Sequence, residues 1–484
     1  MGILWRSGVE NFVYLCDFKN FIFNMKKDKI LEVLKDKKIV IVGFGREGVS
    51  SYKFIRRHFP NQPLAIADRS PLIHIDDFKE DKHVTFVTGE EYDRNLNRFD
   101  LILKSPGVNF NNINYFIPRE KFISQAELFL MAYGENVIGI TGTKGKSTTA
   151  SLIYHILSNA KGNAVLVGNI GIPFFDVIED INDETTIVAE LSAHQLEYTD
   201  YSPHVAILLN LYQEHLDHFN TFNNYQLAKM NITEHQNEND ILIYNFDDLY
   251  IPKLIENHKL VRRFVPFSSQ STLKNGAFCT KTEIVFVKNN EQYCHFPFED
   301  RKNIPGRHNN NNIMAAFLAC KTQNVSNEDI LKYVATFKGL EHRIEFVGNV
   351  QGINFYNDSI STIPEAAIAA LNTVKRVDTL ILGGFDRGID YRILIDYLHE
   401  NPVRNIVFVG KVGERLLQEW QAAGYPLPEN YILENDYTKI VDFAFQNTAE
   451  GCSCLLSPAA ASYDQFKDFT VRGRTFKELV LSHK

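Results

Sequence analysis

A short apolar run, a glycine-rich loop and an amphipathic stretch at residues 136–157 constrain the fold of this chain most strongly. Residues 136–140 read Asn-Val-Ile-Gly-Ile, which has the length and composition of a buried strand. Residues 141–148 read Thr-Gly-Thr-Lys-Gly-Lys-Ser-Thr. A glycine turn between a strand and a helix exposes backbone N–H groups to an anion, and the helix N-terminus adds partial positive charge. One face of the expected helix is apolar, with Leu152, Ile153, Ile156 and Leu157. The segment therefore predicts a phosphate-binding loop in an α/β fold.

Two side chains of this loop can act directly on ATP. Lys146 follows the second glycine and can reach the β- and γ-phosphates, while the hydroxyl of Ser147 can ligate Mg²⁺. The loop departs from the strict G-x-x-x-x-G-K-[ST] pattern, because Ile140 stands where that pattern has its first glycine. We predict that the following residues contact ATP: Gly142, Thr143, Lys144, Gly145, Lys146, Ser147 and Thr148.

The 484 residues form three blocks in which strand-like runs alternate with helical stretches. Buried runs of this kind favour parallel sheets, and the chain is too long for one core. We predict three α/β domains: a Rossmann-like domain at 25–133, a central P-loop ATPase domain at 134–340, and a Rossmann-like domain at 341–484. The expected strands include 38–42, 64–67, 100–104, 136–140, 186–189, 205–209, 283–287, 379–382, 405–409 and 454–456.

The charge and the cysteine pattern exclude several classes of protein. A formal net charge of −8 gives no general attraction to nucleic acid or anionic lipid. No apolar run reaches the length of a membrane span, and the six cysteines fit neither a zinc site nor a disulfide scaffold. We expect a cytoplasmic protein without nucleic-acid partners or membrane insertion. Residues 1–24 are an extension of doubtful status, because Met25 would begin the first domain cleanly.

The glycines of the first block allow a different interpretation. Gly43, Gly45 and Gly48 follow a strand, and Asp68 lies about twenty residues further on, as in a dinucleotide-binding fingerprint. A nicotinamide-dependent oxidoreductase is therefore the competing hypothesis. It leaves the second-block phosphate loop without a role.

Three further residues of the second block can serve metal chemistry. Glu190 follows an expected strand, and a carboxylate there can hold the Mg²⁺ that bridges ATP phosphates. Taken alone, Glu190 would be a solvated carboxylate, His215 a loop histidine and Lys229 a helix-surface lysine.

Four segments together resemble the Mur ligase family, whose relatives include the folylpolyglutamate synthases. The phosphate loop has the form T-G-T-x-G-K-S-T, and residues 190–197 are similar to E-L-S-S-x-Q-L-E. Residues 210–217 are similar to N-x-x-x-D/E-H-x-D, and residues 307–312 to R-H-N-x-x-N. The resemblance extends over roughly residues 35–480 and favours the glutamate-adding members of the family.

The resemblance implies a catalytic and metal-binding set around ATP. Catalysis would depend on Lys146, Glu190, His215 and Lys229, and two Mg²⁺ ions would be held by Ser147, Glu190, His215 and a carbamylated Lys229. Further ATP contacts would come from Asn309, Asn312, Arg343 and Asp358. Asn309 and Asn312 would share one face of a helix, because they are three residues apart.

The resemblance also implies two substrate sites. The substrate UDP-MurNAc-L-Ala would be bound by Gly45, Arg46, Glu47, Asp68, Arg69, Ser105, Pro106, Gly107 and Asn169. The incoming glutamate would be bound by Thr362, Arg387, Ser462 and Phe469. Two positions depart from the usual D-glutamate pattern, because Ile360 and Arg387 stand where that pattern has lysines.

The implied reaction needs no enzyme nucleophile. ATP would phosphorylate the terminal alanine carboxylate, and the amine of glutamate would attack the resulting acyl phosphate, in the synthesis of a peptidoglycan precursor. We favour D-glutamate; the same reaction with L-glutamate and, more distantly, a folylpolyglutamate-type ligase are the alternatives. We expect a monomer.

Overall fold

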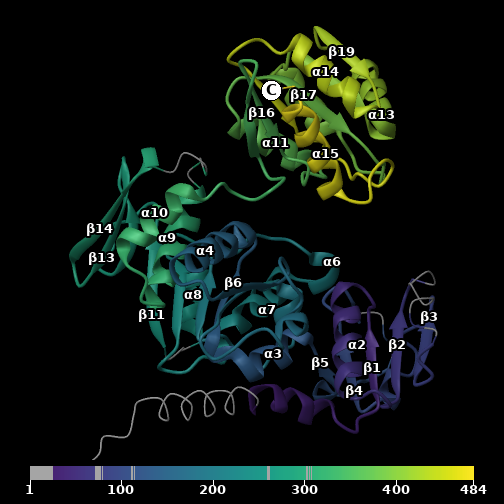
Figure 1. Cartoon of the computed structure of the whole chain (residues 1–484), viewed down its shortest axis with the longest axis vertical. Coiled ribbons are helices and arrows are strands. Elements are labelled where there is room, and N and C mark those ends of the chain that lie inside the picture. Colours follow the sequence, from purple (N-terminus) through teal and green to yellow (C-terminus); the bar gives the residue numbers. More distant parts are fainter. Residues whose placement is uncertain are drawn as a thin grey trace, which may run out of the picture. The chain divides into compact units, whose positions relative to one another are not determined.

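The computed structural model describes residues 25–483, apart from 71–77, 79, 111–112, 114, 259–261, 301–303, 305 and 307. The extension predicted at residues 1–24 lies outside these described residues. The chain forms two compact units: the first is Met1–Asp300 with Arg307–Ala335, and the second is Arg301–Gly306 with Thr336–Lys484. Figure 1 shows two sheets in the first unit and one in the second.

The first sheet has five parallel strands in the order β3-β2-β1-β4-β5, as in a Rossmann fold. Its strands are β1 (Ile39–Val42), β2 (Leu64–Asp68), β3 (Val84–Thr88), β4 (Leu101–Lys104) and β5 (Phe122–Ile123). The helices α2 (Arg46–His58) and α3 (Gln125–Tyr133) follow β1 and β5. All four residues of β1 are buried, because parallel neighbours flank this strand on both sides.

The second sheet has nine strands in the order β14-β13-β12-β11-β10-β9-β6-β8-β7. Seven of its strands run parallel to one another: β6 (Val137–Thr141), β7 (Ala164–Gly168), β8 (Thr186–Glu190), β9 (Val205–Leu208), β10 (Ile241–Asn245), β11 (Arg263–Ser268) and β12 (Gly276–Cys279). An antiparallel hairpin of β13 (Glu283–Lys288) and β14 (Glu291–Pro297) extends it.

Seven α-helices accompany the second sheet in the described part of the chain. They are α4 (Lys146–Lys161), α5 (Ala193–Leu196), α6 (Leu216–Phe219), α7 (Phe222–Glu234), α8 (Ile251–Asn257), α9 (His308–Thr322) and α10 (Asn327–Thr336). The helix α4 begins directly after the glycine loop, as the sequence predicts.

The third sheet has six strands in the order β15-β16-β20-β17-β18-β19. They are β15 (Glu345–Val350), β16 (Ile353–Asn357), β17 (Val377–Gly383), β18 (Asn405–Val409), β19 (Asn430–Leu433) and β20 (Ser453–Leu456). Only β15 is antiparallel to its neighbour within this sheet. The accompanying helices are α11 (Pro364–Thr373), α12 (Arg392–Glu400), α13 (Gly410–Ala422), α14 (Tyr437–Asn447) and α15 (Phe469–Leu481).

The three sheets confirm the predicted α/β fold with a central phosphate-loop sheet between two Rossmann-like sheets along the chain. Each sheet places its candidate residues where parallel strands end, which is where ligands bind in such folds. Asp68 ends β2, and Glu190 ends β8. In the described part of the chain, we find no helix whose length and apolarity would allow it to cross a membrane.

Candidate active site

The phosphate loop turns sharply between β6 and α4. Gly145 caps the helix with φ of +86°, and a Cβ atom there would lie 2.5 Å from Asn312 Oδ1. Only glycine fits both the backbone angle and this close approach. Lys146 is the first residue of α4, and its Nζ donates to the carbonyl oxygens of Gly142 at 2.9 Å and Thr143 at 3.0 Å. The ammonium group is therefore held over the loop, where phosphates bind in such structures.

The segment after β9 holds the phosphate loop in place. The backbone N–H of Thr143 donates to Asn210 O at 2.9 Å, and that of Lys144 donates to Asn210 Oδ1 at 2.8 Å. Tyr225 of α7 adds a hydrogen bond from its hydroxyl to Thr143 Oγ1 at 3.1 Å. The segment after β9 and the helix α7 thus both hold the loop.

The two asparagines at the start of α9 share one helix face, as predicted. Asn312 Nδ2 donates to Asn309 Oδ1 at 2.9 Å, and both side chains are buried. Asn312 Oδ1 accepts a hydrogen bond from Thr149 Oγ1 at 3.2 Å and lies beside Gly145. Asn312 therefore packs against the phosphate loop. Arg307 of the same sequence motif lies outside the described residues.

Lys229 is almost completely buried, on α7. Its Nζ donates to Gly142 O at 2.9 Å, the same carbonyl oxygen that accepts from Lys146. Burial and the nearby charge of Lys146 hold the pKa of Lys229 well below its usual value. The lowered pKa shifts the amine toward its neutral form, which is the form that can react with CO₂.

Glu190 has the environment expected of a metal-binding carboxylate. Its side chain is fully buried, and Oε1 accepts a hydrogen bond from Asn169 Nδ2 at 2.7 Å. Oε2 is buried without a hydrogen-bond partner among the described residues. Leaving a buried carboxylate oxygen unpaired is costly, so this oxygen fits a bound cation. Lys229 lies close enough that the charge of Glu190 acts on its pKa.

His215 lies at the edge of the same cluster. Its backbone is in the left-handed region with φ of +56°, and its side chain is 51% exposed. Burial lowers the pKa of His215, and the positive charges of Lys229 and Lys146 lower it further. The neutral ring can therefore ligate a cation. Ser147, in the first turn of α4, is half-buried.

The metal and phosphate residues predicted from sequence thus gather at the ends of β6, β8 and β9. Two lysines share one carbonyl oxygen, the charges of Lys229 and Lys146 lower the pKa of His215, and the charge of Lys146 lowers that of Lys229. This arrangement can bind a nucleoside triphosphate together with divalent cations.

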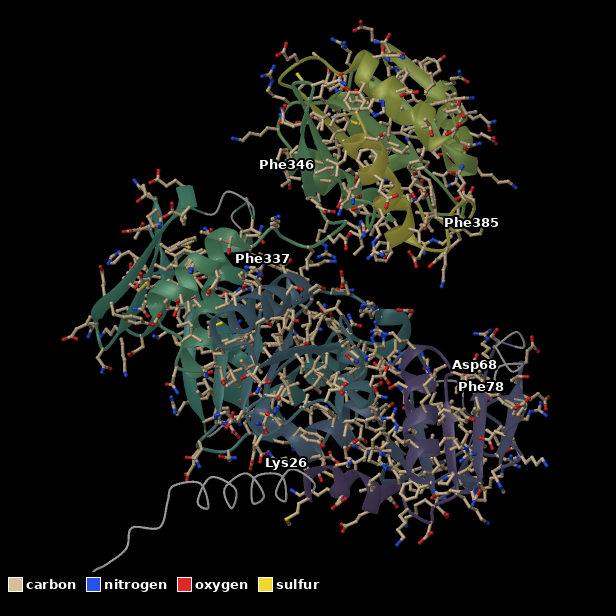
Figure 2. The ribbon with its side chains drawn as sticks, in the orientation of Figure 1. Lys26, Asp68, Phe78, Phe337, Phe346 and Phe385 are labelled. Atoms are coloured by element: carbon tan, nitrogen blue, oxygen red, sulfur yellow. The ribbon has the colours of Figure 1, made fainter. Side chains whose placement is uncertain are left out.

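A pocket of about 750 Å³ lies at the carboxyl ends of β1, β2 and β4. All the residues predicted for UDP except Asn169 line it: Gly45, Arg46, Glu47, Asp68, Arg69, Ser105, Pro106 and Gly107. Its lining also includes residues that the sequence did not indicate, Glu90, Tyr92 and Asp93. Asp68, which Figure 2 labels, accepts hydrogen bonds from the backbone of Phe44 at 2.6 Å and Ser70 at 2.7 Å.

The residues predicted for glutamate lie on loops of the second unit. Arg387 Nη2 donates to Thr362 O at 3.1 Å, which joins the loop after β17 to the loop after β16. Ser462 is buried, while Phe469 is half-buried at the start of α15. Phe385, labelled in Figure 2, is 41% exposed on the Arg387 loop.

Asp358 is buried at the end of β16, and its oxygens accept hydrogen bonds from Ile344 N, Ser361 Oγ and Ser457 Oγ. Burial raises the pKa of Asp358 to about 6. These bonds organise the surrounding loops, so a role in stabilising the loops adds to the predicted ATP contact. Arg343 is exposed.

Sequence reasoning missed Arg472, on α15. Its guanidinium is buried and donates to Ser359 Oγ and O, and to the carbonyl oxygens of Ala460 and Ala461. It therefore joins the two loops that carry Thr362 and Ser462. A signal was available, because Phe469, Arg472 and Phe476 have helical spacing, which places an arginine in an otherwise apolar stripe.

The chain is similar in sequence to known proteins over nearly its whole length. Residues 140–320 match the Mur ligase middle domain, and residues 37–116 match the N-terminal domain of MurD-like Mur ligases. The UDP-N-acetylmuramoylalanine–D-glutamate ligase of Pediococcus pentosaceus is 34% identical over 454 residues, 93% of this chain and 97% of that protein. The ligase of the same name from Ligilactobacillus salivarius is 33% identical over 461 residues, 93% and 98% of the two chains.

Solved structures share the fold at lower identity. The UDP-N-acetylmuramate–alanine ligase MurC of Thermotoga maritima gives a TM-score of 0.56 at 18% identity, over 93% of this chain and all of that chain. MurF ligase of the same organism, in complex with ADP, gives a TM-score of 0.51 at 18% identity, over 88% and 96% of the two chains.

Proposed function

The chain belongs to the Mur ligase family, and from this premise we propose that it joins D-glutamate to UDP-N-acetylmuramoyl-L-alanine at the expense of ATP. The product is a precursor of peptidoglycan. The observation that carries this function is the cluster at the ends of β6 and β8, where Lys146 and Lys229 share one carbonyl oxygen. A nicotinamide-dependent oxidoreductase would give that cluster no role, so the oxidoreductase alternative is rejected.

The chemistry proceeds through an acyl phosphate. A carboxylate is a poor acyl donor, so the alanine carboxylate is first phosphorylated by ATP, and the glutamate amine then displaces phosphate. Mg²⁺, when bound, neutralises charge on the transferring phosphoryl group. Lys146 binds the β- and γ-phosphates, and the loop N–H groups orient them. Glu190 would hold a cation through Oε2, which has no hydrogen-bond partner among the described residues.

We propose that two Mg²⁺ ions are held by Ser147, Glu190, His215 and the carbamate of Lys229. The carbamate is supported by the buried amine, whose lowered pKa favours the neutral form. We further propose domains at residues 25–133, 134–340 and 341–484 that bind UDP, ATP and the amino acid respectively. The protein is proposed to act as a monomer in the cytoplasm, where ATP is present.

The preference for D-glutamate is supported by relatives that carry this activity in their names over nearly the whole chain. Phosphate release should be measured with UDP-MurNAc-L-Ala, ATP and Mg²⁺, with either D- or L-glutamate as the third substrate. We expect turnover with D-glutamate to exceed turnover with L-glutamate at least tenfold, a difference of about 1.4 kcal/mol in the barrier. A preference for L-glutamate would assign the chain to the alternative stereochemistry, and turnover with neither would reject the ligase.

Arg387 is expected to bind the side-chain carboxylate of the incoming glutamate. Its guanidinium is exposed and already points to Thr362, another predicted pocket residue. Hydrogen bonds to charged groups contribute about 1.5–3 kcal/mol, so Arg387→Ala should raise the KM for glutamate roughly tenfold to a hundredfold. The KM values for ATP and for UDP-MurNAc-L-Ala should change little.

Two further variants test the geometry of this contact. Arg387→Lys should recover only part of the loss, because lysine cannot make the paired hydrogen bonds of a guanidinium. Arg392→Ala is the matched control, since Arg392 is exposed nearby and pairs with Asp396 on α12. An unchanged KM for glutamate in Arg387→Ala would show that Arg387 does not bind glutamate, and Thr362 and Ser462 would remain as the predicted contacts.

A further inference from the structure

Arg46 begins α2 directly after the glycine loop of the UDP pocket, but its guanidinium contacts the other sheet of the first unit. Nη2 donates to Gly168 O and to Asn169 O, both at 3.0 Å, and Nη1 donates to Gly171 O at 3.3 Å. The first of these carbonyls belongs to the last residue of β7, and the other two belong to the loop that follows. The arginine thus lines the UDP pocket while holding a loop of the ATP-binding sheet.

The loop that Arg46 holds is bonded on its other side to Glu190. Asn169 donates from its backbone N–H to Glu190 O at 2.9 Å and from Nδ2 to Glu190 Oε1 at 2.7 Å. Gly168 has φ of +99°, and a Cβ atom there would lie 2.3 Å from Glu190 O. The loop therefore packs tightly on the end of β8, with its carbonyls toward Arg46 and the Asn169 amide toward the metal-binding carboxylate.

Glu47, the next residue, contacts the helix that follows Glu190 in the chain. Its Oε1 accepts a hydrogen bond from Gln195 Nε2 at 2.7 Å. Gln195 closes the capping box of α5 with Ser192, so Glu47 is tied to the helix that follows β8. The other carboxylate oxygen, Oε2, is buried without a partner among the described residues. Two adjacent residues of the UDP loop thus hold the loop that is bonded to Glu190 and the helix that follows Glu190 in the chain.

We propose that Arg46 and Glu47 are positioning residues that couple occupancy of the UDP pocket to divalent-cation binding at Glu190. The proposal rests on the proposed function, because it takes a UDP-linked substrate as the occupant of the pocket. The diphosphate of that substrate is anionic and attracts the guanidinium of Arg46, which moves or stiffens the Gly168–Gly171 loop. Asn169 transmits this change to Glu190 through two hydrogen bonds.

Coupling of this kind is reciprocal, so each ligand tightens binding of the other by the same factor. It also has a chemical use. A cation site that is completed only when the UDP-linked substrate is present favours phosphoryl transfer to that substrate over transfer to water. Arg46 and Glu47 need not touch the reacting atoms to have this effect.

The test measures cation affinity rather than turnover. The full chain with ADP is titrated with Mn²⁺, a paramagnetic substitute for Mg²⁺, with and without saturating UDP-MurNAc-L-Ala, and free Mn²⁺ is followed by electron paramagnetic resonance. In the wild type, we expect the substrate to tighten Mn²⁺ binding by about fivefold or more, as is typical of coupled sites. In Arg46→Ala and in Asn169→Ala, this factor should fall to about one at saturation.

Arg69→Ala is the matched control, because Arg69 lines the same pocket but, among the described residues, makes no hydrogen bond to the Gly168–Gly171 loop. It should weaken binding of the UDP-linked substrate and leave the coupling factor unchanged at saturation. Glu47→Ala should lower the coupling factor. Glu47→Gln keeps an oxygen that can accept the hydrogen bond from Gln195, so it should retain most of the coupling. Thermal unfolding of each variant checks that it is folded.

The inference is overturned if the wild type shows no coupling, or if Arg46→Ala and Glu47→Ala both retain it in full. Repeating the titration with UDP in place of the whole substrate separates this outcome from a failure of the proposed function. If UDP tightens Mn²⁺ binding in a chain that releases no phosphate with either glutamate, the coupling between the UDP pocket and the cation site is supported and the proposed ligase function is rejected. If the wild type shows no coupling but ligates D-glutamate normally, the coupling is rejected and the proposed ligase function is supported.

Discussion

Replacing Lys146 with alanine should leave a folded protein that has lost nearly all ligase turnover. Lys146 Nζ lies over the phosphate loop on two carbonyl oxygens, from where it can reach the phosphates of ATP. Removing one preorganised charge or donor at a developing transition state typically lowers kcat by about a hundredfold to a thousandfold. Phosphate release with UDP-MurNAc-L-Ala, ATP and D-glutamate measures the loss.

The control for this variant is Lys161→Ala at the exposed end of the same helix, α4. It removes an equal charge far along the helix and should leave turnover within about twofold, as expected of most surface substitutions. If Lys146→Ala retained more than about a tenth of wild-type turnover, less than about 1.4 kcal/mol of transition-state stabilisation would be lost. The assignment of Lys146 to the phosphates would then be wrong.

Local patterns predicted the elements that carry the site. The strand at Val137–Thr141 and the helix from Lys146 were predictable because an apolar run, a glycine turn and an amphipathic stretch follow one another within about 25 residues. The same holds for β1 and β2, whose buried residues are contiguous in sequence. The UDP residues could also be named, since loops at the ends of neighbouring parallel strands meet at one edge.

The strand β11 is not among the strands expected from the sequence. Pro266 lies within it, and proline normally argues against a strand because it lacks an N–H donor. In the structure, β11 pairs with β10 from Arg263 to Phe267, but its pairing with β12 begins only at Phe267. The pairing with β12 thus starts one residue after Pro266, so the missing N–H of Pro266 interrupts little of that pairing.

Contacts between distant segments could not be predicted from the sequence. Arg46 and Gly168 are 122 residues apart, and Glu47 and Gln195 are 148 apart. No local periodicity links such pairs, because their meeting depends on how two sheets pack. The burial of Lys229 is a similar case: an isolated lysine on a helix is usually exposed, and the packing of α7 against α5, α6, β6 and β9 determines that this one is not.

Replacing Lys229 with alanine should abolish turnover almost as fully as Lys146→Ala, but this loss should be reversible by added carboxylate. The buried neutral amine can add CO₂ to give a carbamate, whose two oxygens would ligate Mg²⁺ as a carboxylate does. Truncation to alanine removes those oxygens and leaves space for a small anion. Acetate or propionate should therefore restore part of the phosphate release, in a saturable manner.

Two comparisons separate the carbamate from a purely structural lysine. Lys229→Met retains the volume of the side chain but leaves no room for an added carboxylate, so acetate should not restore its activity. Acetate should also do nothing for Lys146→Ala, whose missing group is a cation.

Because carbamate formation is reversible, depleting CO₂ and bicarbonate should lower wild-type turnover. Labelling with ¹³CO₂ should give a carbamate signal in the ¹³C spectrum that is absent from Lys229→Ala. A wild-type enzyme that is indifferent to CO₂ and shows no such signal would restrict Lys229 to its hydrogen bond with Gly142, and the second cation would then need a different ligand.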